Sequence, residues 1–128
     1  SPAGLCAWII EKFYSWSDCK GDLESIFSKD ELLANVSLYW LTETINSSIR
    51  LYGESRNAPL HFGKTDFVKV PTAVARFPKE DPFPPREYVE RGFNVVRWTV
   101  MPAGGHFAAM EQPELLSKDI IDFFSQLK

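Results

Sequence analysis

The last third of the sequence restricts the fold most, because it predicts a strand, a glycine-rich loop and a helix in direct succession. Residues 93–100 are rich in β-branched and aromatic side chains and predict a β-strand. Residues 112–128 repeat their apolar side chains at nearly helical spacing, with Asp119 as the one polar residue on that face. The loop between them holds two glycines directly before His106, and glycine allows backbone angles and close approaches that other residues forbid.

A second strand is predicted by residues 66–77, with Pro71 near its start, where a missing N–H is tolerated. Residues 86–91 predict a short helix or turn, so the order is strand, crossover, strand, helix. That order indicates an α/β fold with parallel strands and a right-handed crossover. Two parallel strands alone would leave both sheet edges unpaired. We therefore expect them to be part of a larger sheet whose other strands are absent from this sequence.

The first half of the chain is predicted to be helical. Ser1-Pro2 is typical of a helix start, with a capping serine and proline at the first helical position. The apolar face of that helix is formed by Leu5, Trp8, Ile9, Phe13 and Trp16. Ser28-Lys-Asp-Glu31 is a capping box, and we expect one long helix over residues 29–51 and a loop over 53–63. A division near residue 60 separates this helical part from the α/β part.

Composition excludes several classes of function. The 128 residues suit one domain, and a net charge of −3 without a basic cluster argues against nucleic acid as a partner. No apolar run approaches the roughly 20 residues that span a bilayer. Cys6 and Cys19 are expected to be unlinked thiols in a reducing compartment, so we expect a cytoplasmic protein. The chain has no initiator methionine, which indicates a processed or truncated piece, and a membrane anchor on a missing N-terminal part stays open.

Two side chains can be placed at one edge of the predicted sheet. Glu80 follows the first strand and His106 the second, so the crossover returns the chain to the same edge. Histidine titrates near neutrality and can act as a base, while a carboxylate beside it orients the ring and stabilises its cation. Asp81 is a neighbouring candidate for the carboxylate. From spacing alone, a solvated carboxylate beside Lys79 is the simpler interpretation of Glu80, and a turn histidine is an equal alternative for His106.

Several stretches, in order over nearly the whole chain, carry a resemblance to a known family. They are Ser1-Pro-Ala-Gly-Leu5, Glu11-Lys-Phe13, Trp16-Ser-Asp18, Phe27-Ser-Lys-Asp-Glu-Leu-Leu33, Leu38-Tyr-Trp40, Ser47-Ser-Ile-Arg-Leu-Tyr52, Val70-Pro-Thr72, Phe77-Pro-Lys-Glu80 and Gly104-Gly-His-Phe-Ala-Ala109. The chain resembles the C-terminal portion of an epoxide hydrolase of the microsomal and juvenile-hormone type, a branch of the α/β-hydrolases. The resemblance implies a helical lid segment over residues 1–60 and the C-terminal part of the α/β-hydrolase core over residues 61–128.

The resemblance also implies a role for three residues. His106 corresponds to the general base that activates water against a covalent ester, and Glu80 to its acidic partner. Tyr52 corresponds to one of two lid tyrosines that hydrogen-bond the epoxide oxygen, although its position also suits a core aromatic at a helix end. The implied substrates are a small apolar epoxide and water, the product is a vicinal diol, and no metal or organic cofactor is required. His61 has no matched role, and we expect it at the surface.

The family pattern is incomplete in this sequence. In α/β-hydrolases the nucleophile precedes the acid and the histidine on a strand-to-helix elbow. No Gly-x-Asp-x-Gly elbow occurs here, so we expect the nucleophile and the second lid tyrosine outside this chain, and the isolated chain to be inactive. The alternatives are a non-catalytic truncated fragment, one half of a complementing pair, or another α/β-hydrolase reaction such as dehalogenation or ester cleavage. The partners left open are the missing N-terminal half and a second copy of the chain in a homo-oligomer.

Overall fold

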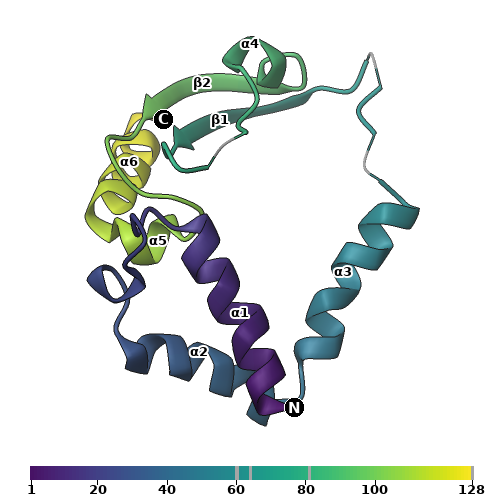
Figure 1. The fold of residues 1–128 in the computed structure, drawn as a ribbon. Coiled ribbons are helices and arrows are strands. Elements are labelled where there is room, and N and C mark those ends of the chain that lie inside the picture. The colour runs from purple at the N-terminus through teal and green to yellow at the C-terminus, as the bar shows by residue number, and fades with distance from the viewer. Residues whose placement is uncertain (60, 64, 81, 128) are drawn as a thin grey trace.

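The computed structural model describes residues 1–59, 61–63, 65–80 and 82–127. Helices come first along the chain and the two strands follow, as Figure 1 shows. The helical part consists of α1 (Pro2–Trp16), a short 3₁₀ turn η1 (Leu23–Ser25), α2 (Lys29–Leu41) and α3 (Ile45–Asn57). The α/β part consists of β1 (Val68–Arg76), α4 (Arg86–Val89), β2 (Phe93–Val100), α5 (Ala108–Glu111) and α6 (Pro113–Gln126).

Helix α1 begins where the sequence predicted. The Ser1 hydroxyl oxygen accepts a hydrogen bond from the Gly4 amide at 3.2 Å, and Pro2 lies in the first turn. The core of the helical part is formed by Leu5, Ile9, Phe13, Phe27, Leu32 and Val36. Trp8 and Trp16 lie outside this core and are 47% and 37% exposed, so their indoles line the surface instead.

The single long helix expected over residues 29–51 is wrong, because a break divides it into α2 and α3. Glu43 takes a φ of +56°, a left-handed conformation in which a helix ends. The Thr42 hydroxyl donates to a carbonyl of the last turn of α2 at 2.6 Å and stabilises that end. The loop expected over residues 53–63 consequently starts later, after Asn57.

Strands β1 and β2 pair in parallel, which confirms the predicted order and the α/β class. Strand β2 spans the predicted residues 93–100, and β1 is slightly shorter than the predicted 66–77. The register shifts at Pro71, which has no N–H to offer, and the Asn94 side-chain amide donates to the Lys69 carbonyl at 3.0 Å. Within the described part of the chain no third strand joins this sheet.

Helix α6 packs against the sheet and explains the polar residue on its apolar face. Asp119 is only 6% exposed, and its Oδ1 accepts hydrogen bonds from Arg97 at 2.6 and 2.9 Å and from the Thr99 hydroxyl at 2.7 Å. A buried carboxylate requires such donors, because leaving it unpaired in the interior is costly. The contact therefore fixes α6 to β2.

Two expectations from composition, unlinked cysteines and no membrane-spanning segment, can be compared with the structure. Cys6 and Cys19 are both free thiols, as expected, with Cys19 buried. No helix in the described ranges combines the length and the apolar character needed to cross a membrane.

Candidate active site

The structure brings Glu80 and His106 together. Glu80 lies in the loop after β1 and His106 in the loop after β2. The Nδ1 atom of His106 lies 3.0 Å from each carboxylate oxygen of Glu80, and the two side chains are 40–45% exposed. The two side chains therefore lie at the same edge of the sheet, as the order of strand, crossover and strand predicted. Asp81, the neighbouring candidate for the carboxylate, lies outside the described residues.

The two loops are held to each other by backbone contacts. The Lys79 amide donates to the Gly104 carbonyl at 3.1 Å, and the Met101 amide donates to the Arg76 carbonyl at 2.8 Å. Gly104 has a φ of +105°, and a Cβ atom there would lie 2.8 Å from the Phe77 ring. A glycine is therefore required for both its conformation and its lack of a side chain. These contacts set the separation of Glu80 and His106.

The C-terminal end of α1 packs onto the same loop, beside α5 in Figure 1. The His106 amide donates to the Trp16 carbonyl at 3.0 Å, and the Gly104 amide donates to the Asp18 carboxylate at 3.2 Å. A Cβ atom on Gly105 would lie 2.6 Å from the Trp16 carbonyl oxygen. The end of α1 and the segment after it are thus in direct contact with His106 and with the two glycines before it.

An open hollow of about 680 Å³ lies beside the Glu80–His106 pair. Trp16 lines it, with its indole 4.9 Å from the imidazole in an edge-to-face arrangement. The ammonium of Lys12 lies 5.2 Å from the centre of the same indole, within cation–π range. A half-exposed acid–histidine pair beside such a hollow is accessible to both water and a substrate.

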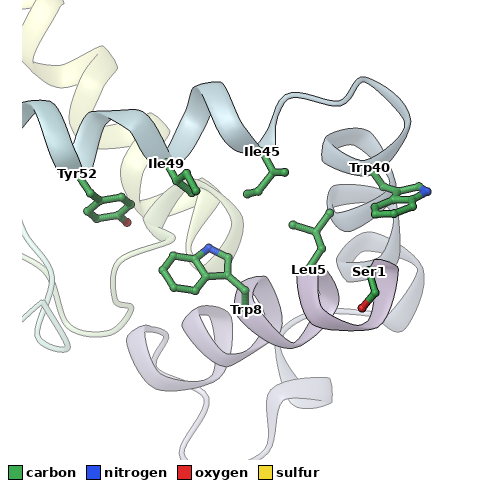
Figure 2. Close-up of a pocket in the computed structure, with 7 residues that line it drawn as sticks. All are labelled: Ser1, Leu5, Trp8, Trp40, Ile45, Ile49 and Tyr52. Atoms are coloured by element: carbon green, nitrogen blue, oxygen red, sulfur yellow. The ribbon is translucent and has the colours of Figure 1, made fainter.

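Tyr52 lies in a different hollow, shown in Figure 2. This space of about 510 Å³ is lined by Ser1, Leu5, Trp8, Trp40, Ile45, Ile49 and Tyr52. Side chains of α3 face those of α1 across it, and the Tyr52 ring meets the Trp8 indole edge-to-face at 6.5 Å. The lining is mostly apolar, and the side chains of Ser1, Tyr52, Trp8 and Trp40 bring the polar atoms to it, which suits a largely hydrocarbon group.

The two hollows lie along one side of α1. Trp8 lines the first and Trp16 the second, and eight helical residues correspond to a rise of about 12 Å. Lys12 lies between them, with its ammonium 5.4 Å from the Trp8 indole and 5.2 Å from the Trp16 indole. A hydrogen bond from this ammonium lowers the pKa of Glu11 below its usual value.

Tyr52 lines the first hollow, whereas Glu80 and His106 line the second. In the described residues Tyr52 therefore does not lie with Glu80 and His106.

Residues 101–107, between β2 and α5, form the histidine loop. Sequence reasoning missed three residues that contact this loop: Trp16, Asp18 and Glu111. Trp16 was assigned to an apolar helix face, although it contacts His106 through both its carbonyl and its ring. Glu111 is buried and accepts hydrogen bonds from two backbone amides. A single acid directly after the apolar run Phe107-Ala-Ala-Met110 is the one local signal that could have drawn attention to Glu111.

Known proteins match this chain over its whole length, although the chain covers only part of theirs. No family model matches the sequence. A putative epoxide hydrolase of Stigmatella aurantiaca is 44% identical over 100% of this chain and 29% of its own length. Epoxide hydrolase 1 of Sus scrofa is 42% identical over 100% of this chain and 30% of its own length. The chain thus spans about 30% of the length of these curated relatives.

A solved structure agrees with the sequence similarity. The crystal structure of juvenile hormone epoxide hydrolase from the silkworm Bombyx mori superimposes with a TM-score of 0.85 and 36% identity. It covers 98% of this chain, which in turn covers 34% of the silkworm chain. The fold described above is therefore similar to a portion of the silkworm structure.

Proposed function

The chain belongs to the epoxide hydrolases of the α/β-hydrolase fold, and on that premise we propose that it supplies the water-activating part of an enzyme that converts apolar epoxides to vicinal diols. The observation that carries this proposal is the Glu80–His106 pair, with Nδ1 3.0 Å from both carboxylate oxygens. The proposed organisation is a helical lid over residues 1–60 and part of the hydrolase core over residues 61–128.

The pair is suited to general-base catalysis. An ionised carboxylate can only accept a hydrogen bond, so a neutral imidazole in this contact carries its proton on Nδ1. The lone pair of Nε2 is then free to take a proton from water. The water oxygen attacks the carbonyl carbon of the alkyl ester, and the ester C–O bond to the diol oxygen breaks. The departing diol oxygen takes the proton back from the imidazolium, and the carboxylic acid that forms releases its proton to solvent, which restores the carboxylate. Glu80 stabilises the imidazolium that forms meanwhile.

The first half of the reaction needs groups beyond this pair. In the family that the chain resembles, an aspartate attacks the epoxide carbon and forms the ester, and we assign that nucleophile to a part of the enzyme outside this sequence. Tyr52 is the proposed donor to the departing epoxide oxygen, because a phenol can donate a hydrogen bond to a developing alkoxide. The apolar hollow around Tyr52 suits the hydrocarbon part of such a substrate.

A hybrid enzyme tests the proposal. The chain replaces the matching segment of the Stigmatella aurantiaca relative, which then provides the remaining parts of the enzyme. We expect the hybrid to convert styrene oxide to its diol, and the isolated chain to show no turnover. Loss of the general base in His106→Ala should lower the rate of diol formation by about 10²- to 10⁴-fold.

His61→Ala and Glu87→Gln serve as matched controls for changes at His106 and Glu80. His61→Ala removes the other, exposed histidine and should leave the rate unchanged. Glu80→Gln should lower the rate, whereas Glu87→Gln on the exposed face of α4 should not. A folded hybrid that retains full diol formation without His106 would contradict the proposal. Cleavage of an ester or a haloalkane, with no activity on the epoxide, would favour the related hydrolase reactions instead.

A further inference from the structure

Glu111 is a buried carboxylate close to His106 that the proposed reaction does not use. It ends the short helix α5, five residues after the histidine, and is 8% exposed. A carboxylate removed from water in this way needs hydrogen-bond donors to offset its lost hydration. The donors that it finds in the structure are two backbone amides.

Those two amides come from opposite ends of the chain. Oε1 of Glu111 accepts a hydrogen bond from the Phe107 amide at 2.9 Å. Oε2 accepts one from the Asp18 amide at 2.7 Å, across 93 positions of sequence. Because each oxygen takes a different amide, the side chain bridges the segment after α1 and the residue next to His106. Hydrogen bonds to an ionised acceptor are stronger than those between neutral groups.

The bridge holds the segment that contacts the imidazole. Two residues before Asp18, the Trp16 carbonyl accepts the His106 amide at 3.0 Å, and the Trp16 indole lies 4.9 Å from the imidazole. Asp18 itself returns a contact, since its carboxylate accepts the Gly104 amide at 3.2 Å. The segment of residues 16–18 thus contacts the histidine loop at Gly104 and at His106, and Glu111 links that segment to Phe107.

We propose that Glu111 is a positioning residue for His106, which clamps the end of α1 onto the histidine loop and so fixes the imidazole against Trp16 and Glu80. This inference rests on the proposed role of His106 as the general base. A base must be held in hydrogen-bond reach of the water that it deprotonates, and small displacements reduce the rate steeply. The clamp acts on the base through the backbone and has no contact with substrate.

Glu111→Gln discriminates this role sharply. Glutamine has the same shape but offers only one acceptor oxygen, and its amide nitrogen is a donor that would face a second donor. One of the two bridging hydrogen bonds is therefore lost. Glu114→Gln is the matched control, because Glu114 lies exposed in the first turn of α6. Asp119→Asn is the second control, since Asp119 is equally buried but binds Arg97 and Thr99 instead of the histidine loop.

Proton NMR of the full chain gives the first readout. The parent should show NOEs between the ring protons of Trp16 and His106, and His61→Ala identifies the histidine signals. In Glu111→Gln we expect these NOEs to disappear and the His106 ring signals to shift, while Glu114→Gln keeps both. Asp119→Asn should lower the midpoint of urea unfolding without changing the His106 signals. If Glu111→Gln does not fold, Glu111→Asp serves instead: its side chain keeps the carboxylate but is one methylene shorter, so it should lose one of the two amides and weaken the same NOEs.

The hybrid enzyme gives the second readout. Glu111→Gln should lower kcat about 10- to 100-fold and lower KM with it, because slower ester hydrolysis makes the alkyl-enzyme accumulate, while kcat/KM, which reports formation of the ester, stays unchanged. Intact Trp16–His106 NOEs in folded Glu111→Gln, or an equal loss of them in Asp119→Asn, would overturn the inference. An active hybrid in which Glu111→Gln matches the parent in kcat would overturn it too. An inactive parent hybrid whose NOEs respond as expected would refute the proposed function and leave the clamp standing.

Discussion

The histidine loop and helix α3 carry the two kinds of group proposed for catalysis, and the chain holds them very differently. Around His106, backbone hydrogen bonds reach both the β1 loop and the end of α1, and Phe107 stacks on Phe13 with ring centres 4.0 Å apart. Helix α3 has no buried residue among those described, and Tyr52 is 62% exposed. The acid–histidine pair is therefore preformed within this chain, whereas the phenol lies on a helix with little packing.

This difference separates the proposed site into a part that the chain itself holds rigidly, around His106, and a part that it does not, around Tyr52. Polar groups that must hold an exact proton geometry are supported by contacts within the chain, which supply a rigid frame. The apolar side of α3 faces a hollow instead of a core, and its Leu51 is 66% exposed. We expect α3 to take its working position only when further surface covers it, since an isolated helix of this length is marginal in water.

The largest effect on stability is expected at Gly105, where the histidine loop lies in close contact with the end of α1. Alanine at Gly105 would place its Cβ atom 2.6 Å from the Trp16 carbonyl oxygen and 3.2 Å from the Asp18 amide nitrogen, both backbone atoms that cannot rotate away. We expect Gly105→Ala to lower the free energy of unfolding by about 3 kcal/mol, as overpacking does. Urea unfolding followed by circular dichroism measures this change.

Alanine at Gly53 is the matched substitution in α3. No atom lies within 4 Å of the added Cβ atom, and alanine favours a helix by about 1 kcal/mol over glycine. Gly53→Ala should therefore raise the helix content without destabilising the chain. Equal destabilisation by both alanines would contradict the contrast between a packed loop and an unpacked helix.

A smaller effect separates the starts of α2 and α3. In α2 the Ser28 hydroxyl and amide donate to the Glu31 carboxylate at 2.7 and 2.9 Å and lower the pKa of Glu31 below its usual value. The Glu31 amide in turn donates to the Ser28 hydroxyl oxygen at 3.2 Å, which confirms the predicted capping box. Because the pKa of Glu31 is lower in the folded chain than in the unfolded chain, its stabilising effect is fully present above the pKa of the unfolded chain. The effect is lost as the pH falls through the pKa of the folded chain. Acidification should fray the first turn of α2.

The start of α3 provides the comparison for that pH effect. Thr44 precedes α3 without a side-chain capping bond, so its first turn should not respond to acid in the same way. Carbon chemical shifts of residues 29–32 and 45–48 measure the two turns separately. Ser28→Ala should remove the pH dependence of the first set, and an equal response of both sets would show that the capping box is not its origin.

Local chemistry in the sequence predicts some elements well and others not at all. Strand β2, the Ser1 cap and the Ser28–Glu31 box each depend on residues next to one another, and all three are confirmed. The break between α2 and α3 had no such signal, because Glu43 adopts a positive φ without the glycine that normally marks one. Because the residues before and after Glu43 both have helical periodicity, the sequence predicts one continuous helix there.

The candidate site divides in the same way. Glu80 and His106 could be brought together from the sequence because a βαβ crossover fixes which ends of the strands are adjacent. The contacts of Glu111 with Asp18 and of Trp16 with His106 join segments about 90 positions apart. No short pattern encodes them, since they depend on how the helical part packs against the loop.

The protonation of the neutral His106 ring tests the central claim most directly. Long-range nitrogen–proton NMR of the isolated chain distinguishes a proton on Nδ1 from one on Nε2, with His61 as the exposed reference. We expect neutral His106 to carry its proton on Nδ1, held by the Glu80 carboxylate, and Glu80→Ala to abolish this preference. A neutral ring protonated on Nε2, or a tautomer unaffected by Glu80→Ala, would contradict a preformed acid–histidine pair.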